Sequence, residues 1–182
     1  LSSASGCSNF NVYNNSSSLT GDNGIFVCGG QDNIIALNVI KNNWNAGCMA
    51  ADASNTRFRD MDLSDNNRAA TNAVGQTGHA EGSIVIKGSS LRADADFICE
   101  ILDTQIYNTG LGSNTDKVGV FLSSSLDAIN DRSSALINID DVGFKSQDYG
   151  IKAECDLDEI RLTLGDLRFI DTVEKNVTAT NG

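Results

Sequence analysis

The stretch from residue 24 to residue 67 decides the fold, because it contains two copies of one pattern. Residues 24–30 read GIFVCGG, residues 32–43 read DNIIALNVIKNN, and residues 47–67 read GCMAADASNTRFRDMDLSDNN. Each copy has a glycine-led apolar strand, a polar corner, a second strand of alternating apolar residues and a final Asn-Asn corner. A repeat of about two dozen residues is typical of solenoids and other repeat arrays. The stretch therefore predicts short strands stacked in a solenoid.

The composition of the 182-residue chain supports short strands and tight corners. There is no proline, and there are 17 glycines; Gly and Asn supply the left-handed backbone conformations that corners need. The length suits one domain with a sizeable core, so we expect a single domain over residues 1–182. Because the sequence starts at Leu1 rather than at a methionine, we expect it to be part of a larger protein.

Charge restricts the class of partner. The formal net charge is -11 and the sequence pI is about 4.3, so the chain would repel a nucleic-acid backbone and an anionic membrane surface. No apolar run approaches the roughly 18 residues of a membrane span. We therefore expect neither nucleic-acid binding nor membrane insertion.

Asparagine pairs recur at the expected corners, at residues 14–15, 42–43 and 66–67. In a solenoid, an Asn at one corner can stack on the Asn of the next turn and satisfy its amide in a ladder. Two segments interrupt the repeat, near residues 68–81 and 108–117. Both are polar and without period, and we expect them to be corner insertions, which in repeat proteins collect on one face.

Five cysteines are present, and none forms a C-x-x-C pair. Structural zinc sites bring ligands in closely spaced pairs, so we expect neither a metal nor another cofactor. Cys7, Cys28 and Cys48 lie about one repeat apart. They are either small buried core residues or form a disulfide between neighbouring turns, Cys7 with Cys28 or Cys28 with Cys48.

The glycine-led strands and the N-x-I-x-x-N-x-I-x-N-N pattern of residues 33–43, echoed at residues 55–67, resemble the right-handed parallel β-helix of the pectate-lyase-like superfamily. That superfamily includes polysaccharide lyases, glycoside hydrolases and the trimeric tailspike and appendage proteins of bacteriophages. The resemblance implies an all-β chain, a right-handed parallel β-helix of about five to seven rungs. Each rung would bury its apolar face by stacking on its neighbours.

Candidate catalytic residues follow from the same resemblance. The motif Asn114-Thr115-Asp116 and the pair Asp140 and Asp141 resemble acidic motifs of polygalacturonase-type hydrolases, in which carboxylates protonate the leaving oxygen and activate water. About one rung separates Asp116 from Asp140, so the carboxylates could share a face. Lys152 falls where that family carries a basic residue that contacts the sugar acid.

A lyase would need a base opposite calcium-binding carboxylates. The sequence offers Arg57 and Arg59 near Asp60 and Asp62, with Asp52 and Asp65 in the same region. Strict alternation would separate them, with Arg57, Arg59 and Met61 on one face and Phe58, Asp60 and Asp62 on the other. A solvated face with charge pairs explains these residues equally well. Four aromatic residues are candidate sugar-stacking platforms, or else cap the core or lie in a subunit contact: Trp44, Tyr13, Tyr107 and Tyr149.

The resemblance implies a virion or extracellular protein. The expected role is structural and adhesive, as in a phage tailspike, appendage or capsid decoration protein that presents its faces to other subunits or to a surface polysaccharide. The expected partners are two further copies in a homotrimer and other virion subunits. The alternative is a polysaccharide-degrading hydrolase or lyase with the same fold.

Overall fold

The chain is all-β throughout the residues that the structure describes. This computed structural model describes residues 9–18, 20, 22–28, 30–51, 53–68, 82–87, 97–109, 117–123, 135–154, 160–171 and 175–179. Within these ranges every regular element is a strand, and every pairing between strands is parallel. The described residues contain no helix that could span a membrane.

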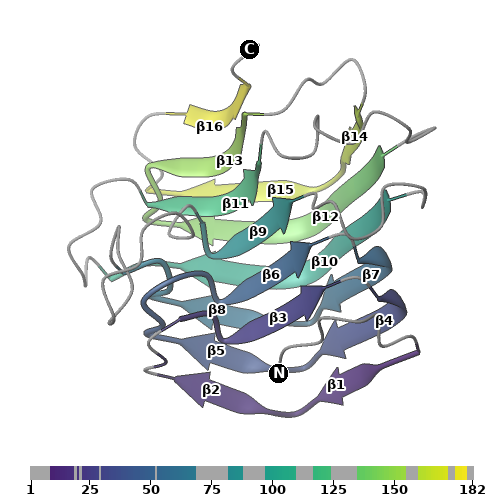
Figure 1. The fold of residues 1–182 in the computed structure, drawn as a ribbon. Coiled ribbons are helices and arrows are strands. Elements are labelled where there is room, and N and C mark those ends of the chain that lie inside the picture. The colour runs from purple at the N-terminus through teal and green to yellow at the C-terminus, as the bar shows by residue number, and fades with distance from the viewer. Residues whose placement is uncertain are drawn as a thin grey trace.

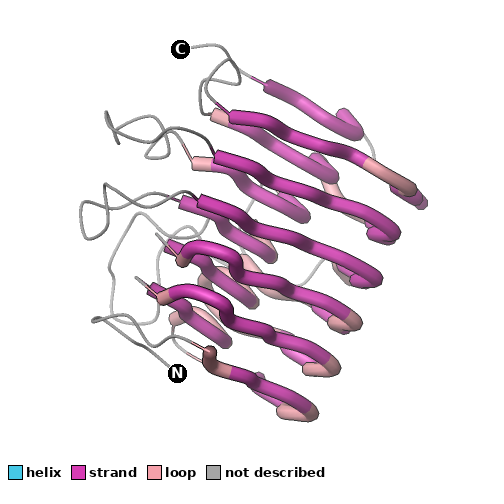
Figure 2. Tube along the Cα trace, turned by 90° about the vertical axis from the view of Figure 1, so that its right-hand side faces the viewer, coloured by secondary structure: helices cyan, strands magenta, loops and turns pink. Residues whose placement is uncertain are grey.

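The strands stack in layers along the molecule, from β1 at one end to β16 at the other (Figure 1). The 6-stranded sheet takes one strand from each layer, in the order β3 (Ile25–Cys28), β6 (Cys48–Ala51), β9 (Ile84–Lys87), β11 (Val118–Leu122), β13 (Tyr149–Ala153) and β16 (Lys175–Ala179). This sheet is called the short-strand sheet below. Figure 2 shows the same layers from the side.

The 10-stranded sheet takes the rest of each layer and is called the long-strand sheet. Its first three layers contain the strand pairs β1 (Asn11–Tyr13) and β2 (Ser16–Ser18), β4 (Gln31–Ala36) and β5 (Val39–Lys41), and β7 (Ser54–Arg59) and β8 (Asp62–Ser64). Its last three layers contain β10 (Phe97–Tyr107), β12 (Ala135–Lys145), and the pair β14 (Ile160–Leu164) and β15 (Leu167–Ile170).

A continuous apolar core lies between the two sheets. In the long-strand sheet, Ile35 pairs with Phe58, Phe58 with Ile101 and Ile101 with Ile139 in neighbouring strands, and all four side chains are buried. Fully burying side chains of this size contributes about 1.5–3 kcal/mol each. The core therefore runs through successive layers.

A second apolar cluster lies on the other face of the short-strand sheet. Met49, Val85 and Phe121 occupy equivalent positions in β6, β9 and β11, alternate with core residues and are buried. The middle strands of this sheet are thus buried on both faces, as is common for parallel strands.

A column of left-handed residues bends the long-strand sheet at the same place in five layers. Asn14, Leu37, Asp60, Asp103 and Asp141 have φ angles between 49° and 56°. Such residues reset the alternation of side chains, because the strand changes direction there. The predicted alternation across Asp60 is wrong for this reason: Phe58 and Met61 are both buried, whereas Arg57 and Arg59 are exposed.

The predicted asparagine ladder exists, but as two ladders. In one corner the Asn43 Nδ2 donates a hydrogen bond to Asn66 Oδ1 at 2.8 Å. In another corner the Asn15 Nδ2 donates to Asn38 Oδ1 at 3.2 Å. Both pairs are separated by 23 residues, which is the length of the regular repeat. The prediction that residues 14–15 share a corner with residues 42–43 is therefore wrong.

The cysteines that the structure describes are buried. Cys48 and Cys99 are free thiols in the core, so the alternative of a Cys28–Cys48 disulfide is wrong. In the sheet Cys48 lies beside Ile25, and Cys28 lies beside Ala51, so the two cysteines are out of register. Cys7 lies outside the described residues.

Most of each predicted insertion, residues 69–81 and 110–116, also lies outside the described residues. The strands on either side of the insertions are described. β8 lies beside β10, and β9 lies beside β11. The two insertions consequently leave and re-enter the sheets at the same corner of adjacent layers.

Candidate functional site

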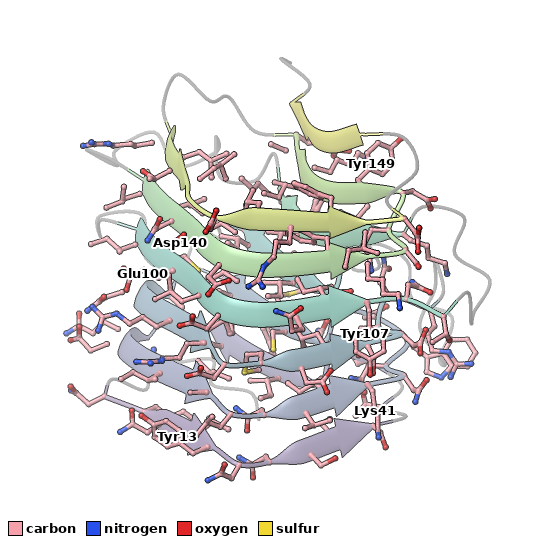
Figure 3. All side chains as sticks on the ribbon, turned by 180° about the vertical axis from the view of Figure 1, so that it is seen from behind. Tyr13, Lys41, Glu100, Tyr107, Asp140 and Tyr149 are labelled. Atoms are coloured by element: carbon pink, nitrogen blue, oxygen red, sulfur yellow. The ribbon has the colours of Figure 1, made fainter. Side chains whose placement is uncertain are left out.

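The predicted site residues lie in separate parts of the molecule. Asp140 and Asp141 belong to β12 of the long-strand sheet, whereas Lys152 and Tyr149 belong to β13 of the short-strand sheet. Figure 3 shows Asp140 and Tyr149 at different ends of the view. Asp116 lies outside the described residues. The structure does not bring Lys152 together with the Asp140–Asp141 pair.

The Asp140 carboxylate shapes a corner of the backbone. Its Oδ1 accepts hydrogen bonds from the Asp141 N–H at 3.0 Å and from the Asp166 N–H of the next layer at 2.7 Å. It lies against Gly165, where any added methyl group would collide with the carboxylate. Asp140 therefore stabilises the corner, and Gly165 leaves room for its carboxylate because it has no side chain.

Asp141 is the left-handed residue of the same corner, with φ 49°. Its carboxylate forms an ion pair with the Arg168 guanidinium across the layers. Similar ion pairs join Arg57 to Glu100 of the next layer and Arg59 to Asp60 of the same layer. Arg57, Arg59 and Asp60, which were proposed for a lyase, thus form ion pairs on a solvated face.

Lys152 and Tyr149 form a small cluster on the short-strand sheet. The Lys152 Nζ lies 2.9 Å from a Glu154 carboxylate oxygen, and it lies 5.8 Å from the Tyr149 ring centroid and 5.7 Å from that of Phe121. These distances fit cation–π contacts. Tyr149 also packs against the second apolar cluster.

Trp44 lies at the corner from which the insertions leave the sheets. Its side chain is 37% exposed, and the Arg68 guanidinium lies 5.9 Å from its ring centroid. Lys117 lies close enough to Arg68 for the two positive charges to repel each other. Partial burial lowers the pKa of Lys117, while the Asp148 and Asp65 carboxylates oppose this shift.

A hollow of about 330 Å³ lies on the outer face of the long-strand sheet. Tyr107 is the predicted site residue that lines it. The other lining residues, which the sequence analysis missed, include an amide, two cations, a glycine and an exposed isoleucine: Gln105, Lys145, Arg168, Gly143 and Ile170. Only their register across three layers brings them together. Gly143, a glycine between the apolar residues Val142 and Phe144, is the signal that could have found the hollow.

A second hollow of about 330 Å³ lies near the other end of the same sheet and has a polar lining. Asn9, Asp32 and Asn55 line it from equivalent left-handed corners. The Asn55 Nδ2 donates a hydrogen bond to Asp32 Oδ1 at 2.5 Å. Among the described residues, no group of three or more His, Cys, Asp or Glu side chains is placed to hold a metal ion.

Comparisons with known proteins found no relative of this chain. A scan against protein-family models, a search of curated proteins and a search of solved structures each gave no match. The function must therefore be argued from the geometry of the described residues.

Proposed function

We propose that this chain is a right-handed parallel β-helix that acts as a structural and adhesive module of a virion or an extracellular appendage. The layered parallel strands and the continuous core support a rigid shaft. In such a shaft each layer stabilises its neighbours, and the outer faces remain available for contacts. The hollow on the long-strand sheet offers one place where a surface polysaccharide can bind.

One observation carries this proposal over the enzymatic alternative. Asp140 is one of the predicted catalytic carboxylates. It accepts two backbone N–H hydrogen bonds at a corner. Its neighbour Asp141 is engaged by Arg168. A pair of hydrolytic carboxylates should instead face a common space that admits a sugar. These two side chains support the backbone and a surface ion pair.

Exposed apolar side chains support contact between subunits. Tyr13, Leu37 and Val39 are 44%, 52% and 37% exposed. Tyr13 lies in β1 beside Ala36 of β4, Leu37 lies in the corner between β4 and β5, and Val39 begins β5. Large apolar side chains that cluster on a surface are typical of protein interfaces. We assign this surface to a homotrimer of the chain, with other virion subunits as further partners.

Light scattering on the isolated chain tests the trimer, and reducing-sugar release from a panel of acidic and neutral polysaccharides tests for catalysis. We expect a mass of three chains and no release. A double variant, Tyr13→Ser with Val39→Ser, should yield monomers that keep their fold. A monomeric wild-type chain would contradict the trimer. Sugar release that Asp140→Asn abolishes would establish the polysaccharide-degrading alternative.

A further inference from the structure

The hollow on the long-strand sheet exists because one outward-facing side chain is missing. Gly143 lies beside Gln105 of β10 and beside Arg168 of β15, so it separates two long side chains in one column. A methyl group at residue 143 would meet the Gln105 side-chain amide. The amide therefore lies over the glycine, and the hollow opens beside it.

The neighbouring outward column supplies an aromatic wall and a cation. Tyr107 pairs with Lys145, and Lys145 pairs with Ile170; all three line the hollow. The Tyr107 side chain is half-buried, whereas Lys145 and Ile170 are exposed. The lining thus combines apolar surface with a few polar groups, as in small-molecule sites. Its volume is at the lower end for such sites, which suits a single small ring.

The cationic groups of the hollow differ in how they are engaged. The Arg168 guanidinium is held by Asp141. The Lys145 ammonium has neither a hydrogen bond nor an ion pair among the described residues. At physiological ionic strength charges are screened beyond about 8 Å. A bound anion would therefore respond to the nearby charges of Lys145, Arg168 and Asp141 rather than to the net charge of -11, and Lys145 is the cation whose charge no described carboxylate offsets.

We propose that the hollow binds the carboxylate-bearing ring of an acidic sugar. The ring would lie beside the Gln105 amide that covers Gly143, with its C–H face against Tyr107. Its carboxylate would meet the Lys145 ammonium and the Arg168 guanidinium, and Gln105 would hydrogen-bond a hydroxyl. This inference rests on the proposed adhesive function and names its ligand class. A pyranose fits because it presents an apolar face and a polar rim together, which a small inorganic anion does not.

The test is a nuclear magnetic resonance titration of the isotope-labelled chain with four monosaccharides and inorganic phosphate. Galacturonic acid and glucuronic acid at millimolar concentrations should shift the backbone amide signals of Tyr107, Gly143 and Lys145. Galactose and glucose, which lack the carboxylate, should shift them much less. Phosphate should also have little effect, because it cannot use the aromatic wall. Equal shifts with the neutral sugars or with phosphate would overturn the proposal, as would the absence of shifts with both acids.

Two variants and one matched control locate the effect. Lys145→Met keeps the length of the side chain and should weaken acid binding at least about tenfold, since it removes a charge-assisted hydrogen bond. Gly143→Ala should push the Gln105 amide away from residue 143 and into the hollow, and should abolish binding. Lys41→Met is the control, because Lys41 is exposed and lies in the same outward column, two layers before Tyr107. Loss of binding in Lys41→Met, or no loss in Lys145→Met, would contradict the proposal.

The result separates this inference from the proposed function. If an intact polysaccharide binds the chain but neither acid shifts the hollow signals, the adhesive function stands and the hollow is the wrong site. If no polysaccharide binds but both acids shift the hollow signals, the site is right and the adhesive role is wrong. The amide spectrum of each variant away from the hollow shows whether the fold is retained.

Discussion

At the scale of single residues, the left-handed corners are positions of local backbone strain. Four of the five residues in the bending column are Asn or Asp, which tolerate this conformation. The fifth is Leu37, with φ 56° and a side chain that is 52% exposed. A leucine gains no local hydrogen bond there, and its apolar side chain faces outward. The strain is consistent with a role for Leu37 in the proposed subunit contact.

The strain at Leu37 predicts that Leu37→Asn stabilises the isolated monomer. The gain should be about 1 kcal/mol, because a left-handed backbone costs an ordinary residue about 1–2 kcal/mol and Asn less. Urea unfolding in the monomeric Tyr13→Ser, Val39→Ser background measures it, and Lys41→Asn, at an exposed position of β5, should give no gain. If Leu37→Asn lowers the unfolding midpoint of the monomer, the assignment of strain is wrong. In the trimer the same change should weaken association.

The buried asparagine ladder predicts a large effect from Asn43→Ala. The Asn43 Oδ1 accepts a hydrogen bond from the Thr20 hydroxyl at 2.7 Å, and its Nδ2 donates to Asn66. Removing the amide leaves buried partners unsatisfied, which should cost about 3 kcal/mol in the free energy of unfolding. Asn11→Ala, at an exposed position of β1, is the control and should change stability by less than about 0.5 kcal/mol. Equal effects of the two variants in urea unfolding would contradict the ladder.

At the scale of strands, stability should depend on how many neighbouring layers a side chain touches. Phe58 lies between Ile35 and Ile101 and is fully buried. Phe169 lies in β15, is half-buried, and stacks on Phe144 with ring centroids 5.2 Å apart. In stacked repeats each layer is stabilised mainly by the layers that it touches.

This difference predicts that Phe58→Ala costs about 3–5 kcal/mol, whereas Phe169→Ala costs about 1–2 kcal/mol, since less apolar surface loses its burial. Urea unfolding of the two variants side by side gives the comparison. If Phe169→Ala lowers the free energy of unfolding more than Phe58→Ala does, stability does not depend on the number of neighbouring layers that a side chain touches.

The strand scale also shows how far the sequence predicts this structure. Glycine-led strands, alternating apolar residues and the repeat length predicted an all-β chain of parallel strands, because these features are local. Three things were missed. Asp60 resets the alternation of its strand, Asp140 binds the backbone of the next layer, and Gly143 opens a hollow between Gln105 and Arg168. Each depends on which residues lie side by side in neighbouring layers. The sequence alone does not show this register, because insertions of different length separate the layers.

At the scale of the whole molecule, the buried thiols predict how stability changes at high pH. Burial raises the pKa of Cys48 and Cys99 above the ordinary thiol value of 9.0. Above pH 9.0 the unfolded chain therefore loses these protons while the folded chain keeps them. The free energy of unfolding should then fall with rising pH, by about 1.4 kcal/mol per pH unit for each thiol.

Urea unfolding between pH 8 and pH 10.5 measures this slope. The double variant Cys48→Ala with Cys99→Ala is less stable at pH 8 because of the small cavities, but its slope above pH 9.0 should be shallower. An equal slope in both proteins would show that these thiols do not titrate on unfolding in this range.

The central claim is that this chain binds polysaccharide without cutting it, and one measurement tests it most directly. The chain is incubated with high-molar-mass polygalacturonate, alginate, hyaluronan and neutral dextran, and each mixture is separated by size with light-scattering detection. We expect the protein to co-elute with at least one polymer whose molar mass stays unchanged. A falling polymer mass, or protein that elutes alone in every mixture, would contradict the account.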